Sequence, residues 1–259
     1  MLWLWALCCC LSHWWSISSA NRSDSISHRR TVMAKLCSEA VCMQASALCV
    51  QRGAKLLLKE ISAVIPAGKV TLILGHNGAG KTLLMQTLHG LVTPTSGQVM
   101  GPDIAVQKMV FQTPVMLRCT ASKHFDFLCP GASQEEKLSW FKRASLVGRM
   151  QVPARSLSGG EQQKLAIIGA LASQPEVLFL DEPAANLDFE ATAFVEEMIR
   201  WSAKDGTTIV MVSHNRAQAE RLADHILFMD KGRLMEQTSA KQFFCAPSSD
   251  AGRTYLNFA

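Results

Sequence analysis

The sequence predicts an α/β fold built on a largely parallel sheet, with a small helical insertion. Three observations over its 259 residues support this prediction. Short apolar runs bounded by polar turns recur along the chain, as is typical of strands buried in a parallel sheet. Segments with apolar residues at helical spacing lie between several of these runs. Between residues 112 and 157 the strand pattern disappears and helical patterns replace it.

The composition is that of a globular chain and excludes several classes of protein. Hydrophobic residues make up 48% and charged residues 18% of the chain, which argues against disorder and against a fibrous repeat. No basic stripe with interleaved aromatic residues accompanies the net charge of +5, so we expect no nucleic acid as a partner. The most apolar stretch, residues 1–11, is shorter than the roughly 20 residues that a membrane-spanning helix needs.

Residues 1–44 differ in composition from the rest of the chain. Four of the six tryptophans and three of the nine cysteines lie in the first 15 residues, and the remaining cysteines have no metal-ligand spacing. The apolar start resembles a secretory signal, but no lysine or arginine precedes it. A signal or anchor is therefore the alternative to our expectation, which is a disordered extension or a non-native start, with Met33 or Met43 as the true one. The folded domain is expected to span residues 45–259.

The elements of the domain are expected in a regular order. Strands are predicted at 47–51 and 61–65, and a stronger strand at 70–74 leads through a glycine-rich segment to a helix at 81–89, which Gly90 closes. Later strands are predicted at 109–111, 177–180, 208–212 and 226–229, with helices at 162–172 and 189–203.

The helical insertion is expected at about 113–156. Ser133 and Glu136 have the spacing of a capping box and predict a helix that runs to about residue 147, after an earlier helix at 120–128. The apolar residues Trp140, Phe141 and Leu146 are interpreted as packing residues rather than as a ligand-binding box.

A glycine-rich segment between the strand at 70–74 and the helix at 81–89 fits the pattern G-x-x-x-x-G-K-[ST]. Glycines allow successive backbone N–H groups to turn inward around a phosphate, and the helix N-terminus adds its positive dipole end. Lys81 would reach the β and γ phosphates, and Thr82 would coordinate Mg²⁺. A chance glycine-rich turn is the alternative, which the flanking strand and helix disfavour. The segment comprises Gly75, His76, Asn77, Gly78, Ala79, Gly80, Lys81 and Thr82.

Two adjacent carboxylates, Asp181 and Glu182, follow the apolar strand at 177–180. Ligands of open α/β sheets bind at the carboxyl ends of the strands, where these side chains lie. Asp181 can support Mg²⁺, and Glu182 can polarise an attacking water. A solvated acidic turn is the alternative when the pair is taken alone.

The segment LSGGEQQK at 157–164 predicts a second helix start that could bind an anion. Ser158 and Glu161 have capping-box spacing, and spacing alone leaves a plain helix cap as the alternative. One nucleotide needs only one phosphate-binding loop. The second helix start therefore suggests a site for the nucleotide of another molecule.

The motifs GHNGAGKT, LSGGEQQK and VLFLDEP, the segment 185–188 and the pair Ser213 and His214 occur in the order found in ATP-binding subunits of ABC transporters. The chain resembles this family from about residue 45 to its C-terminus, and LSGG between the other two motifs is a highly specific combination. The resemblance implies a P-loop NTPase core with a mostly parallel sheet, an N-terminal antiparallel β subdomain and the helical insertion. In this family two subunits enclose two ATP molecules head to tail.

The resemblance implies a role for each matching residue. Glu182 would be the general base, His214 the switch at the γ-phosphate, and Gln112 its sensor. Thr82, Gln112 and Asp181 would hold Mg²⁺, and the P-loop would bind the phosphates of ATP. The partner's nucleotide would be bound by Ser158, Gly159 and Gly160, with Asp188 coupling the two sites.

The chain departs from the family pattern at two positions. Where many relatives have an aromatic residue that stacks on adenine, it has Arg52, so base contact would depend on that guanidinium. Leu83 stands where a second hydroxyl is common. We expect hydrolysis to be kept and nucleotide affinity or base selectivity to be relaxed.

The resemblance also implies partners. These are transmembrane permease subunits docked at the helical insertion, a second copy of the chain and, indirectly, a substrate-binding protein, with the chain peripheral at the cytoplasmic face of the membrane. The segment 111–118, Leu83 and the ending at 235–247 are similar to the ATPases of tungstate-type oxyanion importers. Importers of phosphate or amino acids, and a soluble ATP-switched assembly factor, are the alternatives.

Overall fold

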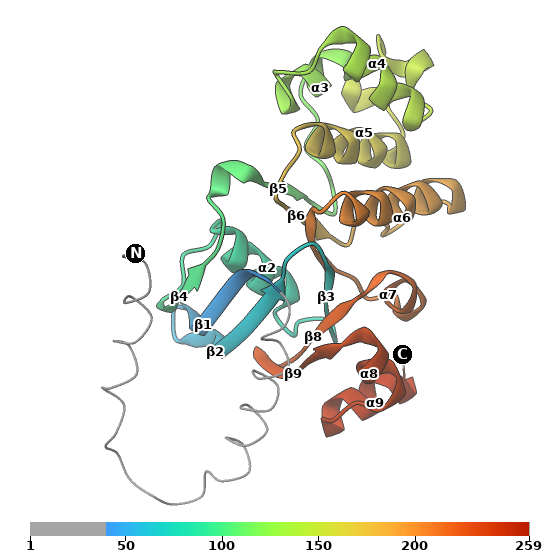
Figure 1. Ribbon diagram of the computed structural model, residues 1–259. Helices are drawn as coiled ribbons and strands as arrows, with labels where there is room; N and C mark the ends of the chain where they lie inside the picture. The colour runs from blue at the N-terminus through green and yellow to red at the C-terminus, as the bar shows by residue number, and fades with distance from the viewer. Residues whose placement is uncertain (1–39, 259) are drawn as a thin grey trace, which may run out of the picture. The chain divides into compact units, whose positions relative to one another are not determined.

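The computed structural model describes residues 40–258, so the expectations for residues 1–39 lie outside the described part of the chain. The described residues form two sheets (Figure 1). One has three strands in the order β2-β1-β4, and the other has six in the order β5-β6-β7-β3-β8-β9.

The three-stranded sheet is the antiparallel N-terminal subdomain that the resemblance implies. It consists of β1 (Val41–Arg52), β2 (Lys55–Pro66) and β4 (Ser96–Met100). β1 pairs antiparallel with both neighbours, and Gly53, at a φ of 58°, turns the chain into β2. β1 begins at Val41, so residues 41–44, which we expected in the extension, belong to this sheet.

The six-stranded sheet is parallel except at one edge. Its strands are β3 (Val70–Gly75), β5 (Gln107–Val110), β6 (Val177–Asp181), β7 (Thr208–Val212), β8 (His225–Asp230) and β9 (Arg233–Ser239). Only β9 runs antiparallel to its neighbour, β8. Strands β3, β6 and β7 are buried along their whole length, as expected of central strands covered on both faces. The α/β fold with a mostly parallel sheet is confirmed.

The helices lie at both faces of this sheet and in the insertion. The helices of the core are α2 (Lys81–His89), α5 (Gly159–Ala172), α6 (Phe189–Lys204), α7 (Arg216–Leu222), α8 (Ala240–Cys245) and α9 (Asp250–Phe258). Among the described residues, none of the helices combines the length and the apolar character that crossing a membrane requires.

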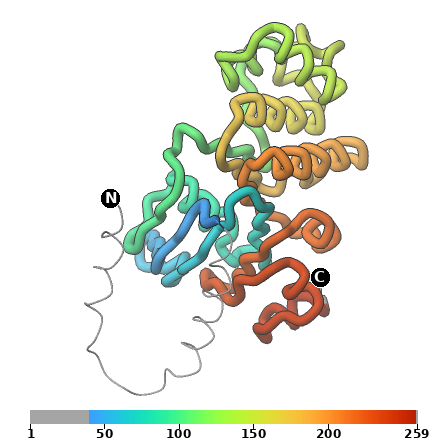
Figure 2. Tube along the Cα trace, viewed as in Figure 1, coloured from blue at the N-terminus to red at the C-terminus, as the bar shows by residue number. Residues whose placement is uncertain are grey.

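The insertion contains α3 (Ala121–Leu128) and α4 (Gln134–Arg143), with 3₁₀ turns at Val147–Arg149 and Ala154–Ser156. Another 3₁₀ turn, Ile104–Val106, precedes β5. The capping box of Ser133 and Glu136 is confirmed, but our expectation that α4 runs to residue 147 is wrong. The helix ends at Arg143 because Ser145 adopts a left-handed conformation with a φ of 58°. In Figure 2 the insertion and the C-terminal helices lie at opposite ends of the described chain.

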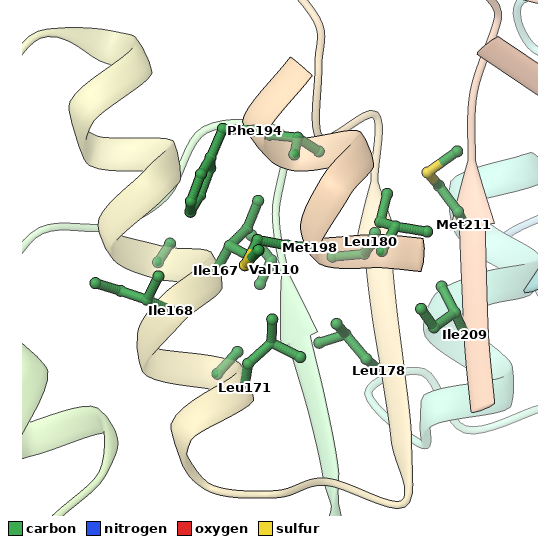
Figure 3. Packing of buried hydrophobic residues seen from close by; sticks show 14 of the residues in the cluster. Val110, Ile167, Ile168, Leu171, Leu178, Leu180, Phe194, Met198, Ile209 and Met211 are labelled. Carbon is green, nitrogen blue, oxygen red and sulfur yellow. The ribbon is translucent and has the colours of Figure 1, made fainter. Parts of the chain in front are cut away.

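Apolar side chains alternate between the two faces of the sheet. Leu178 and Leu180 of β6 pack with α5 and α6, against side chains such as Ile167 and Met198 (Figure 3). Val177 and Phe179 point to the opposite face, into a second cluster that includes Leu84, Met85 and Leu88 of α2. This packing holds the carboxyl end of β6 in a fixed register between the two helix layers.

Candidate functional site

The P-loop turns the chain directly from β3 into α2, and its glycines are needed for the conformation. Gly75 has a φ of 146°, and a Cβ there would collide with the carbonyl oxygen of Met229. Gly80 has a φ of 98° and is the N-cap of α2, so it adopts a conformation that a side chain would strain. Residues 76–78 are exposed, which leaves the loop accessible to a phosphate.

Lys81 lies across the inside of this loop. Its Nζ donates hydrogen bonds to the backbone oxygens of Gly75, at 2.9 Å, and His76, at 3.1 Å. Burial lowers its pKa, while the charges of Glu182 and Asp181 act in the opposite direction. Because neither hydrogen-bond partner is charged, an anionic phosphate oxygen would be a stronger partner for this ammonium than the two carbonyls.

Thr82 and Asp181 form a pair of oxygen groups beside the loop. The Thr82 hydroxyl donates to the Asp181 carboxylate over 3.0 Å, and Asp181 ends β6 with only 8% of its surface exposed. Burial raises the pKa of Asp181, although the hydrogen bond from Thr82 opposes this. A hydroxyl and a carboxylate are hard oxygen ligands, so the pair fits Mg²⁺, whose remaining ligands are typically waters and substrate phosphates. The described residues contain no group of three or more acidic, histidine or cysteine side chains that could hold a metal ion.

Three neighbouring strands bring Glu182, Gln112 and His214 together. These residues follow β6, β5 and β7, which are adjacent in the sheet. The Glu182 Oε2 atom accepts a hydrogen bond from Gln112 Nε2 at 3.3 Å and lies 3.1 Å from His214 Nδ1. Glu182 has a φ of 45°, a conformation that is uncommon for a residue with a side chain and recurs at functional sites.

Glu182 is the candidate general base of this cluster. Its side chain is 19% exposed, so water can reach it, and it lies close enough to Lys81 to act on that residue's titration. The sequence predicted each member of this cluster separately, and the structure brings them together with Lys81, Thr82 and Asp181.

A second helix start lies at Ser158, the N-cap of α5. The Ser158 hydroxyl accepts from the backbone N–H of Glu161, and the Glu161 carboxylate accepts from the backbone N–H of Ser158, so the predicted capping box is confirmed. This backbone hydrogen bond also lowers the pKa of Glu161. A Cβ at Gly159 would meet nothing within 4 Å. Within residues 40–258 no hydrogen bond joins this helix start to the P-loop.

Asp188 lies next to this second helix start. It caps α6 by accepting from the backbone N–H of Ala191 at 2.7 Å, and a Cβ at Gly160 would lie 3.2 Å from the Cβ of Ala191. The N-termini of α5 and α6 therefore lie side by side. Phe189, the first residue of α6, has 89% of its surface exposed at this place.

One predicted site residue stays apart, and one contact was not predicted. Arg52 is exposed at the end of β1, and none of its hydrogen bonds within the described residues reaches the P-loop. The unpredicted contact joins His76 of the P-loop to Tyr255 of α9, with ring centroids 5.4 Å apart. No sequence signal links these two positions, because Tyr255 lies outside the P-loop motif that contains His76.

A loop with the P-loop pattern, a hydroxyl and carboxylate pair that fits Mg²⁺ and a water-accessible carboxylate at the ends of parallel strands are the features of a P-loop nucleoside triphosphatase. Residues 58–185 match the family model described as ABC transporter. The L-cystine import ATP-binding protein TcyC of Bacillus subtilis is 32% identical over 226 residues, covering 78% of this chain and 92% of that protein. The chain belongs to the family of ATP-binding subunits of ABC transporters, and it is an ATPase.

Other relatives agree with this assignment. The glutamine transport ATP-binding protein GlnQ of Geobacillus stearothermophilus is 29% identical over 78% of this chain and 92% of its own length. The phosphate import ATP-binding protein PstB of Mycoplasmoides gallisepticum is 31% identical over 79% of this chain and 71% of its own. The solved structure of cbiO1 from Clostridium perfringens, part of the transporter complex cbiONQ, superposes with a TM-score of 0.70 at 27% identity, covering 80% of this chain and 92% of that one.

Proposed function

We propose that the chain is the ATP-hydrolysing subunit of an ABC importer and works as a head-to-tail dimer with two ATP molecules between its copies. The observation that carries this proposal is the cluster of Glu182, Gln112 and His214 beside Lys81 and Asp181, which has the groups that hydrolysis requires in one place. The second helix start at Ser158 supports the dimer, because a helix N-terminus can bind an anion and no hydrogen bond within the described residues joins this one to the P-loop.

Each residue of the cluster has a role that its geometry supports. The backbone N–H groups of residues 77–80 and the Lys81 ammonium bind the phosphates. Thr82, Asp181 and Gln112 would hold Mg²⁺, which would supply positive charge to neutralise the phosphates of the nucleotide. Glu182 orients the attacking water and accepts its proton.

His214 moves between two partners in this proposal. It lies against the Glu182 carboxylate in the structure and would contact the γ-phosphate when ATP is bound. This exchange would make the segment after β7 sensitive to the third phosphate. Arg52 is proposed to contact adenine, from its exposed position at the end of β1.

The second anion site is proposed to act across the dimer. Ser158, Gly159 and Gly160 would bind the γ-phosphate held by the partner's P-loop, and Asp188 would couple the two sites from the neighbouring start of α6. Phe189 would then lie at the contact between the copies, where its exposed ring would be covered.

Gly159 allows a sharp test of the dimer. Because a Cβ on Gly159 would meet nothing within 4 Å, both Gly159→Ala and Gly159→Asp should fold with unchanged thermal stability. The aspartate adds a negative charge where the partner's phosphate would bind, so turnover should fall at least tenfold while ATP binding to the variant's own P-loop stays intact. Equal turnover in the aspartate and alanine variants would overturn the trans arrangement.

The cargo is proposed to be tungstate or a related oxyanion. Leu83 and the segment 111–118 support this choice. The names of the relatives favour the second candidate, an importer of amino acids or phosphate. A soluble ATP-switched assembly factor is the remaining alternative.

The transport test uses the chain with its membrane partners. The proposal places the chain at the cytoplasmic face of the membrane, bound through the insertion at about 113–156 to permease subunits that receive cargo from a substrate-binding protein. Co-purified complexes in vesicles should take up tungstate in a vanadate-sensitive manner, more readily than phosphate, cystine or glutamine. Preferred uptake of phosphate or an amino acid would favour the second candidate, and absence of any membrane partner would favour the assembly factor.

A further inference from the structure

The C-terminal helix α9 packs against the P-loop through one aromatic contact. The ring of Tyr255 lies edge to face with the imidazole of His76, with centroids 5.4 Å apart and planes at 76°. Tyr255 has 5% of its surface exposed, and its ring also packs against Phe228 of β8, with centroids 5.2 Å apart. The exposed His76 therefore rests on a ring that the sheet itself supports.

The backbone oxygen of His76 also stabilises the conformation of the P-loop. Its backbone oxygen accepts hydrogen bonds from Lys81 Nζ and from the backbone N–H of Ala79, both at 3.1 Å. The position of His76 thus affects the direction of the Lys81 ammonium and the turn of the loop. Loss of the packing around the His76 side chain would therefore change the positions of both the Lys81 ammonium and the loop backbone.

The far end of α9 is joined to the segment that follows His214. Arg216, the first residue of α7, donates from Nη1 to the backbone oxygen of Leu256 at 2.7 Å. A cation beside the last carbonyls of a helix also interacts favourably with the helix dipole. One short helix therefore contacts both the P-loop and the start of the helix after the switch residue.

The beginning of α9 is held firmly on the sheet. The Glu236 carboxylate of β9, with 6% exposure, accepts from the backbone N–H groups of Ser248 and Ser249 and from the Ser249 hydroxyl, at 2.9 to 3.0 Å. Three hydrogen bonds to one buried charge leave the helix start little freedom. Movement of the P-loop at His76 is therefore opposed by the sheet through α9.

We propose that Tyr255 is a positioning residue of the ATP site: through His76 it holds the P-loop and Lys81 in the conformation that binds phosphate. This rests on the proposed function of the P-loop. Tyr255 does not touch the phosphate-binding groups itself, so it acts on the affinity for ATP through His76. The Leu256 and Arg216 hydrogen bond extends the same support to the segment after His214.

The test compares three single variants of the full chain. Tyr255→Leu removes the ring and should raise the Kd and the KM for ATP about 3- to 10-fold, with kcat changed less than about twofold. Tyr255→Phe keeps the ring and should stay within about twofold of the parent chain in Kd. Phe244→Leu is the matched control, because it removes an aromatic contact with Phe243 on α8 and touches no P-loop residue. Thermal melting of each variant measures the effect on stability.

A structural role alone would give a different pattern. If Tyr255→Leu and Phe244→Leu lower the melting temperature alike while the Kd for ATP stays unchanged, the proposal is overturned. Should Tyr255→Leu not fold, His76→Leu tests the same contact from its exposed side, and it should raise the Kd to the same extent. When Tyr255→Leu and His76→Leu are combined in one chain, their effects on the Kd for ATP should not add, because each change removes the same contact. An additive result would also overturn the proposal.

The failure of this inference can be told apart from failure of the proposed function. Lys81→Ala removes the phosphate ligand directly. Loss of ATP binding in that variant with an unchanged Kd in Tyr255→Leu would reject the role of Tyr255 alone. Unchanged binding in Lys81→Ala would reject the P-loop assignment and the positioning role with it.

Discussion

Replacing Glu182 by Gln tests the proposed chemistry most directly. The amide has the shape of the carboxylate, and its oxygen can still accept hydrogen bonds from Gln112 and His214, which lie 3.3 and 3.1 Å from Glu182 Oε2. The free energy of unfolding should therefore change by about 1 kcal/mol or less. All phosphate ligands stay in place, so the Kd for ATP should be within about threefold of the parent chain.

The expected loss is in turnover. An amide cannot accept the proton of the attacking water, and general-base catalysis typically contributes about 10²- to 10⁴-fold. A thousandfold fall in kcat corresponds to about 4 kcal/mol in the activation free energy. With binding intact and hydrolysis blocked, the variant should also accumulate as a dimer at saturating ATP.

Three measurements check this prediction. Phosphate release at saturating ATP gives kcat, a binding titration gives the Kd, and light scattering during gel filtration gives the mass. Glu197→Gln, an exposed position on α6, is the matched control for the change in charge and should behave like the parent chain. A kcat within about threefold of the parent would refute the assignment of Glu182 as the base, and monomers at saturating ATP would count against the trans arrangement.

Other predictions concern binding, pH and the N-terminal segment. Lys81→Ala should weaken ATP binding at least tenfold in calorimetry, because it removes the charged partner of the phosphates; unchanged affinity would contradict the P-loop assignment. Burial lowers the pKa of His225 to about 4, whereas in the unfolded chain this side chain has its ordinary pKa of about 6.5. Between these two pH values the unfolded chain therefore binds a proton that the folded chain does not. The free energy of unfolding should then fall by up to about 3 kcal/mol as the pH drops from about 6.5 to about 4, and His225→Phe should show a smaller fall in urea titrations. A chain begun at Met33 should keep its ATPase activity, since the first described strand starts at Val41; a substantial loss in a phosphate-release assay would assign the segment before it a role in the fold.

The buried centre of the fold was predicted well from the sequence, and its edges were not. The strand at 208–212 and the helix at 81–89 agree with the structure residue by residue, because a fully buried apolar run and a Gly90 cap define their ends. β4 and β9 were missed. β4 is mostly exposed and carries Gly97, and β9 mixes polar and apolar residues at the antiparallel edge, so neither has the apolar run of a buried strand.

The local motifs of the site were predictable, whereas its long-range contacts were not. The residue pattern and its flanking strand and helix indicated the P-loop, and adjacent strand ends explain why Glu182 meets Gln112 and His214. The packing of Tyr255 on His76 depends on how the last helix folds back over β8, which no local pattern encodes. Such contacts come from tertiary packing and require the structure.

The alternation along β6 links the hydrophobic core to the chemistry. Odd-numbered residues of this strand face α2, and Asp181, the next odd position, meets Thr82 at the start of that helix. The even-numbered Leu178 and Leu180 face the other helix layer. Deleting one residue from β6 would therefore exchange the two faces and bring the longer Glu182 side chain toward Thr82. The alternation of these four apolar side chains thus determines which carboxylate lies beside Thr82 and which lies beside Gln112 and His214, and a one-residue shift would disturb the core as well as the proposed roles.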